Sequence, residues 1–349
     1  MHVPYDLSRV EVLDLSQNFS MNSPSFAFYE GPTVKWVKRL AFEGVNAQLI
    51  SSTNHIATHL DSPSHFYDPG ADIAGIPIET LVGPACVVDL CQFGVGDYGI
   101  YGPEHFERWE KETGITIERG DILVIHTGYH RFYNEDWHKS VPCPVRGVVE
   151  AEAHEPDLPR CFLRHPGPTG RFVEWVLDRG IRWLAVDCIA ADHPFNTNVR
   201  KARPDLVPEV EQAIGRSLAD AMPWPEDYQC MHVKLFPRGV FHAENVGGRI
   251  DEVLNQRVWV GCFPFRFAGG EAAFSRFVAF VERGGKGNVG AELASARGEA
   301  TTPAREEASS SPTSDRVQRK GDVGAELASA RTRGSETYDR VHDRQGGSS

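Results

Sequence analysis

The sequence predicts an α/β protein in which buried strands and amphipathic helices follow one another along the chain. Two observations carry this prediction. Apolar runs of strand length at residues 121–128 and 181–186 indicate buried strands. Segments with helix start and stop signals at residues 103–109 and 170–180 indicate helices between them. With 349 residues, the chain can bury one large core or two moderate ones.

The remaining elements are expected in the following order. Shorter strands are predicted at residues 10–16, 45–52 and 86–90, and the last core strands at 257–263 and 276–281. A loop rich in proline and aromatic residues covers 23–32, and irregular insertions are expected at 129–170 and 196–226. Near residue 231 a short element ends at Pro237-Arg238-Gly239 and leads into a strand that places His242 and Glu244 on one face.

Composition excludes several classes of protein. The net charge of -12 argues against nucleic acid or an anionic membrane surface as partner. Apolar runs stay shorter than the roughly 18 residues that a membrane span needs. The first residues lack the basic and apolar regions of a signal peptide. The seven cysteines are scattered without a C-x-x-C pair, which is typical of reduced thiols, so we expect a cytoplasmic protein.

The composition changes near residue 284. Large apolar residues become rare, and residues 289–297 recur unchanged at 323–331. Two such short copies cannot build a repeat fold. We therefore expect one folded domain over residues 1–283 and a disordered, non-catalytic tail over residues 284–349.

Three histidines and one aspartate lie within eleven residues, at spacings of four, two and four: His55, His59, Asp61 and His65. Imidazole and carboxylate groups are the usual ligands of zinc, manganese or iron. A polar loop with ordinary histidines is the alternative, and it would suffice for a single histidine. Four candidate ligands in this register favour a metal site.

The backbone of this segment can be tested against geometry. In a helix, Asp61 would point away from the two histidines before it, and Pro63 would break the helix. In a straight strand, His55 and His59 would lie about 13 Å apart at Cα, near the limit for sharing one ion, whereas His59 and Asp61 would lie about 6.6 Å apart. We therefore predict a strand that bends near Ala57 and turns after Asp61.

The run from His55 to His65 resembles a family signature. It matches H-x-G-T-H-x-D-x-P-x-H of the putative cyclase family, which includes bacterial kynurenine formamidases and isatin hydrolases. Further matches lie at 14–16, 121–128, 187 and 239–245, so that the resemblance covers about residues 10 to 282. It implies a single compact α/β domain with a barrel-like mixed β-sheet flanked by helices, assembled as a homodimer or homotetramer.

The resemblance also implies roles for individual residues. His55, His59 and Asp61 match the ligands of a first metal, and Asp61 matches an aspartate that bridges to a second. The glutamate of the second metal matches Glu244, and the family's twelve-residue spacing back from it lands on His232. We therefore favour His232 over His242, which stays a candidate.

His65 matches the catalytic acid/base of the family. Phe26, Phe28 and Tyr29 occupy the loop where the formamidases place a tryptophan near the substrate. One departure concerns the backbone. The family glycine is Ala57 here, so the bend must be gentler or its cost must be compensated.

The predicted function is hydrolysis of an amide, formamide or lactam C–N bond in a small-molecule substrate by a metal-activated water. One or two Zn²⁺ or Mn²⁺ ions are the expected cofactors. The alternatives are a lactonase or a cyclase/dehydratase with the same metal site, or a metal-binding protein without turnover. An intact His65 argues against the last, because a structural site needs no additional proton carrier.

Overall fold

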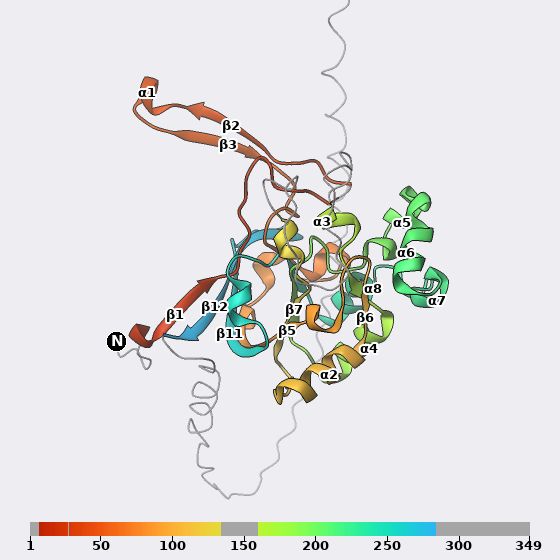
Figure 1. Ribbon diagram of the computed structural model, residues 1–349. Coiled ribbons are helices and arrows are strands. Elements are labelled where there is room, and N and C mark those ends of the chain that lie inside the picture. The colour runs from red at the N-terminus through yellow and green to blue at the C-terminus, as the bar shows by residue number, and fades with distance from the viewer. Residues whose placement is uncertain (1–6, 27, 134–159, 284–349) are drawn as a thin grey trace, which may run out of the picture. The chain divides into compact units, whose positions relative to one another are not determined.

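The computed structural model describes residues 7–26, 28–133 and 160–283 (Figure 1). The predicted tail, residues 284–349, and most of the insertion predicted at 129–170 lie outside this range.

The central sheet closes on itself. Its eight strands follow the order β1-β12-β11-β5-β7-β9-β10-β4, and β4 also pairs with β12. Seven strands therefore form a ring, and β1 pairs with a different part of β12 than β4 does. The predicted barrel-like mixed sheet is confirmed. The strands are β1 (Val10–Asp14), β4 (His59–Asp61), β5 (Val82–Asp89), β7 (Ile122–His126), β9 (Trp183–Val186), β10 (His242–Glu244), β11 (Gln256–Pro264) and β12 (Ala272–Glu282).

The parallel strands β5, β7 and β9 are buried on both faces, as their continuous apolar sequences predict. Alternate residues serve two cores, because successive side chains of a strand point to opposite sides. Val87 and Val124 pack with residues from strands around the barrel. Val88 and Ile125 pack with residues of the helices. The sequence thus supplies an inner and an outer core from the same strands.

The helices cover the outer core. The two longest are α2 (Pro103–Thr113) and α4 (Gly170–Arg179), and the predicted glycine stop of α4 is present, with Gly180 at φ 69° in the left-handed region. Phe106 of α2 stacks on Phe172 of α4 with ring centroids 4.8 Å apart. The shorter helices are α1 (Leu40–Glu43), α3 (Arg160–Leu163), α5 (Val199–Ala202), α6 (Val207–Ile214), α7 (Leu218–Ala221) and α8 (Cys230–Leu235). The insertion predicted at 196–226 therefore contains α5, α6 and α7, which lie together in Figure 1.

Two small sheets complete the described fold. The strands β6 (Ile100–Tyr101) and β8 (Gly167–Pro168) form one parallel pair. The other is an antiparallel hairpin of β2 (Thr33–Lys38) and β3 (Ala47–Ser51). The strand predicted at 45–52 is thus present but pairs outside the barrel, with a strand that the sequence did not predict. Within the described residues, no helix is long and apolar enough to cross a membrane.

Candidate metal centre

Strand β4 brings the motif residues together with a distant part of the chain. It pairs antiparallel with β10, so that Asp61 lies opposite His242 and His59 lies opposite Glu244. Residues directly opposite in adjacent strands present their side chains on the same face. The pairing therefore places four potential ligands, from two segments more than 180 residues apart in the sequence, on one face of the sheet.

A first group of ligand atoms surrounds one oxygen of Asp61. Nδ1 of His55 lies 3.2 Å and Nε2 of His59 3.4 Å from Oδ1 of Asp61. Oε2 of Glu244 lies 3.4 Å from the same His59 nitrogen. Ligands at tetrahedral zinc, with bonds of about 2.0–2.1 Å, lie about 3.3 Å from one another. The spacing of this group fits a single ion.

A second group surrounds the other oxygen of Asp61. Nε2 of His242 lies 3.4 Å from Oδ2 of Asp61 and 3.3 Å from Oε1 of Glu244. Nε2 of His232 lies 3.8 Å from each of these oxygens. The two histidine nitrogens are 3.3 Å apart. The sequence left open whether His232 or His242 is the ligand. In the structure both histidines belong to this group.

Neighbouring acceptors orient two of the rings, those of His59 and His232. Nδ1 of His59 donates to the carbonyl of Ala57 at 2.9 Å, which turns its Nε2 toward Asp61. Nδ1 of His232 lies 2.6 Å from Oδ2 of Asp192, which leaves its Nε2 for the second group. Such contacts fix which ring nitrogen carries the lone pair. Asp192 thus supports a candidate ligand, although the sequence alone gave Asp192 no definite role.

The electrostatics of the centre favour a cation. Asp61 is fully buried, and neither of its carboxylate oxygens has a hydrogen-bond partner; Nε2 of His59 also lacks one. A buried carboxylate without a donor is costly unless a positive charge neutralises it. Burial alone would lower the pKa of His55, but the charge of Asp61 outweighs it and raises that pKa to about 10. The donor set and its unpartnered atoms therefore fit one or two divalent ions.

Glu271 is a site residue that the sequence did not indicate. Its Oε2 accepts from Nδ1 of His65 at 2.8 Å and from Nε2 of His55 at 2.9 Å. His55 thus presents Nδ1 to Asp61, and His65 contacts Glu271 through Nδ1 and not through Nε2. Burial lowers the pKa of His65, against the opposing effect of Glu271. No spacing pattern marks Glu271, because its position depends on the pairing of Ala272 with Asp61.

The bend before β4 is sharp and not gentle, so that part of the prediction is wrong. Ala57 has φ 56°, a left-handed conformation that costs a residue with a side chain more than it costs glycine. Contacts on both sides hold the bend. The Ala57 carbonyl accepts from His59, the Thr58 hydroxyl donates to the Asn245 carbonyl, and Thr58 Oγ1 accepts from the Gln17 amide. The cost is compensated, as the second alternative predicted.

The aromatic residues of the N-terminal loop lie at different distances from the centre. Tyr29 stacks on His55 with ring centroids 5.2 Å apart. Burial, followed by the charges of Asp61 and Glu244, raises the pKa of Tyr29 to about 12. Phe26 packs against the outer core, and Phe28 is exposed. Of the three candidate substrate-binding residues, Tyr29 is the one whose ring contacts a residue of the centre.

A further aromatic residue lies at the second group. Phe66 packs its ring against His65 at 4.8 Å and against His232 at 4.6 Å, yet 39% of it is exposed. It stands directly after the last motif histidine, and sequence reasoning assigned it no role. An apolar ring beside the proposed proton carrier suits contact with a substrate.

The sequence was compared with protein families and with curated proteins. The sequence pattern described as putative cyclase matches residues 13–193, about half of the chain. The kynurenine formamidase of Bacillus thuringiensis (strain Al Hakam) is 28% identical over 130 residues, which cover 36% of this chain and 55% of the relative. The chain thus spans about half the length of the curated relatives it matches.

Solved structures share the fold over a longer range. Isatin hydrolase A from Labrenzia aggregata superposes with a TM-score of 0.58 at 19% identity, over 79% of this chain and 95% of that one. A structure described as a potential metal-dependent hydrolase with cyclase activity gives 0.50 at 18% identity, over 78% and 98%. At these identities the likeness establishes the fold.

Proposed function

The chain belongs to the putative cyclase family, and from that premise we propose that it is a metal-dependent hydrolase that cleaves an amide, formamide or lactam C–N bond in a small molecule. The observation that carries the proposal is Asp61, a buried carboxylate with one oxygen toward each of two ligand groups and no hydrogen-bond donor. The names of the relatives, kynurenine formamidase and isatin hydrolase, support this bond type.

We propose that His55, His59 and Asp61 hold one ion and that Asp61, His232 and Glu244 hold a second, with His242 as a further ligand of the second. Zinc or manganese suits the mixture of imidazole and carboxylate. An ion there would lower the pKa of a bound water and polarise a substrate carbonyl.

The protein's own residues supply the proton transfers. His65 takes the proton of the attacking water on Nε2 and returns it to the leaving nitrogen. Glu271 accepts from Nδ1 of His65, so the ring keeps its orientation and its free Nε2 in every cycle. Tyr29 and Phe66 form an aromatic mouth around His55 and His65 that suits a planar substrate. Phe26 and Phe28 belong to the same loop and complete the proposed substrate side.

Two other chemistries fit the same ligands. A lactonase would attack a C–O bond with the same groups, and a cyclase or dehydratase would use the ion to polarise a carbonyl without adding water. A metal-binding protein without turnover is the alternative from a different class. The contact between His65 and Glu271 favours an enzyme, because a carboxylate-oriented histidine beside the ligands serves proton transfer and not metal retention.

Two variants test the assignment. Asp61→Ala should lose the metal of this centre, because it removes a ligand from both groups, whereas His65→Ala should keep that metal and lose at least about 100-fold in turnover. Metal content by mass spectrometry and turnover of N-formylkynurenine, isatin and simple lactones, with and without chelator, provide the readouts. Full metal occupancy in Asp61→Ala would refute the ligand assignment. If none of these substrates is turned over, with or without chelator, the result would favour a metal-binding protein without turnover.

We further propose a homodimer or homotetramer in the cytoplasm. An apolar face of the β2–β3 hairpin supports the assembly, since Trp36 and Ile50 are 39% and 53% exposed there. Five of the described cysteines are free and buried, which supports a reducing compartment: Cys86, Cys161, Cys188, Cys230 and Cys262. Sedimentation of the full chain measures the assembly, and fractionation of the native host tests the location.

A further inference from the structure

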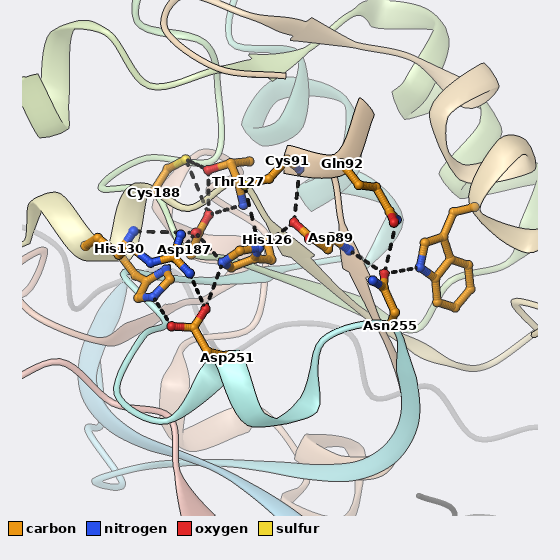
Figure 2. A network of polar contacts seen from close by, with 12 residues as sticks. Asp89, Cys91, Gln92, His126, Thr127, His130, Asp187, Cys188, Asp251 and Asn255 are labelled. Carbon is orange, nitrogen blue, oxygen red and sulfur yellow. Dashed lines mark hydrogen bonds and ion pairs between the residues drawn. The ribbon is translucent and has the colours of Figure 1, made fainter. Parts of the chain in front are cut away.

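A second cluster of histidines and carboxylates lies at the ends of the parallel strands and shares no residue with the candidate metal centre. His126 ends β7, and His130 lies one turn later in the 3₁₀ helix Tyr129–Phe132. Asp187 follows β9, and Asp251 lies in the 3₁₀ helix Ile250–Val253. Asp89 ends the neighbouring β5. Figure 2 shows these side chains converging from four segments.

Both imidazoles are oriented through Nδ1 by a carboxylate. Nδ1 of His126 lies 2.7 Å from Oδ1 of Asp89, and Nδ1 of His130 lies 3.2 Å from Oδ2 of Asp187. Asp187 is itself fixed by the amide and hydroxyl of Thr127, at 2.9 and 2.7 Å. A carboxylate on one ring nitrogen is the usual support of a histidine that binds a metal through the other.

The two Nε2 atoms face the same carboxylate. Nε2 of His126 lies 3.7 Å from Oδ1 of Asp251, and Nε2 of His130 lies 3.5 Å from its Oδ2 (Figure 2). Ligands at tetrahedral zinc lie about 3.3 Å apart. His126 is 1% exposed, and its Nε2 has no hydrogen-bond partner. A buried nitrogen aimed at a carboxylate without a bond between them is what a missing cation would explain.

The charges around the cluster also favour a bound cation. Three carboxylates, on Asp89, Asp187 and Asp251, contact the two imidazoles, and one guanidinium, that of Arg131, lies 2.5 Å from Asp251. Burial by itself would lower the pKa of His126, yet Asp89 and Asp187 raise it, so the local potential is negative. The side chain of Asp251 is 47% exposed, which gives an ion access from solvent.

We propose that His126, His130 and Asp251 form a second, separate binding site for one divalent ion of the zinc type. The two ring nitrogens and the carboxylate of Asp251, which turns one oxygen toward each ring, provide the protein ligands, and water completes the coordination. The ion fastens the 3₁₀ helix Ile250–Val253 to the end of β7. This helix begins six residues after Glu244, so the site clamps the segment that leaves the candidate metal centre.

The competing explanation for the arrangement of these residues is a second proton on His126 in place of a metal ion. A doubly protonated His126 would donate from Nε2 toward Asp251 and pair with the surrounding carboxylates without any metal. The two explanations differ in metal stoichiometry, and they remain distinguishable whether or not the proposed function is correct.

The test counts zinc on the purified full chain after chelator treatment, equilibration with Zn²⁺ and removal of free ion. Asp251→Asn should bind one ion per chain fewer than the wild type. Glu252→Gln, the neighbouring exposed carboxylate paired with Arg249, should bind as many as the wild type. Asp61→Asn empties the first centre, and it should retain one ion that the double variant Asp61→Asn/Asp251→Asn loses.

A second measurement guards against a folding defect. Cobalt added to Asp61→Asn should give visible absorption of a site with nitrogen and oxygen ligands, and the double variant should lose it while its circular dichroism stays unchanged. Equal zinc counts in the wild type and Asp251→Asn would overturn the proposal in favour of the proton. So would a cobalt spectrum in Asp61→Asn that Asp251→Asn leaves intact.

Discussion

At the scale of the residue, two carboxylates organise the candidate metal centre. Asp61 directs Oδ1 to His55 and His59 and Oδ2 to His242, and Glu244 divides its oxygens in the same way. Each therefore belongs to both ligand groups. Burial opposes their charge, yet the facing imidazoles hold the pKa of Asp61 well below its usual range. Both carboxylates are thus ionised and acceptor-only at neutral pH.

Glu271→Gln should lower kcat about 10- to 100-fold, because a neutral amide oxygen holds His55 and His65 more weakly than the carboxylate oxygen that both rings contact. The pKa of His65 should also fall when the carboxylate that supports its protonated form is lost, so the acidic limb of kcat/KM should shift to lower pH. Steady-state kinetics between pH 5 and 8 measure both effects. Glu282→Gln, an exposed glutamate on β12, is the matched control with wild-type kinetics expected. An unshifted acidic limb in Glu271→Gln would contradict the role as a positioning residue.

His193 should make stability depend on pH. Its Nε2–H donates to the Tyr98 carbonyl at 3.0 Å and its Nδ1 accepts from the Phe195 amide at 3.0 Å, so the neutral ring is satisfied on both sides. Burial lowers its pKa to about 3, below the unfolded value of about 6.5. The unfolded chain therefore binds the proton first as pH falls, and stability present above pH 6.5 is lost below it.

The measurement compares the free energy of unfolding of the wild type and His193→Asn at two pH values. The asparagine oxygen can still accept from Phe195, but it does not titrate. The advantage of the wild type at pH 7 should shrink by about 2 kcal/mol at pH 5. Parallel pH curves for the two proteins would contradict this assignment.

At the scale of the element, the short strand β4 and the bend before it build the site. His59 and Asp61 occupy alternate positions of β4 and face the same way. His55 reaches them only because Ala57 turns the chain with φ 56°. The bend replaces the separation of about 13 Å that a straight strand would impose on the two histidines.

Ala57→Gly should be almost neutral. Relief of the left-handed strain, about 1–2 kcal/mol, offsets the lost methyl burial and the greater freedom of glycine in the unfolded chain, which together cost about the same. Ala85→Gly, at a buried position of β5, has no strain to relieve and should lose about 1–2 kcal/mol. Denaturant unfolding of both variants at equal metal content measures the difference. Equal losses at the two positions would show that the bend carries no strain.

Local spacing predicted the residues that β4 and its flanks contribute. His55, His59, Asp61 and His65 lie close enough in sequence for one short element to bring them together. His232 came from a family spacing. Glu271 could not be predicted, because its place at His65 depends on the register between β12 and β4, which no local pattern encodes.

At the scale of the whole molecule, apolar runs predicted the parallel strands and the flanking helices well. Closure of the barrel came only from the family resemblance, because β4 has three residues and two partners from the far end of the chain. Strand β2 was missed, since its exposed, mixed sequence lacks the apolar run that marks a buried strand.

The hairpin should be an interface between copies of the chain. Val34 lies opposite Ile50, and Trp36 continues the same face. Ile50→Glu should convert the assembly to smaller species, because a buried charge at this face is costly. Ser51→Glu places the same charge on the opposite face and should not. Light scattering measures both, and unchanged mass in Ile50→Glu would exclude this face as the interface.

The pairing of β4 with both β10 and β12 has a consequence for the lifetime of bound ions. The strands β4 and β10 are the two shortest of the ring, with three residues each, and a closed sheet opens most readily where the fewest backbone bonds must break. Separating β4 from β10 would also part Asp61 from His242 and His59 from Glu244. Ion release and opening of the barrel would then be one event, so a bound ion would keep β4 paired with β10 in addition to its role in the chemistry.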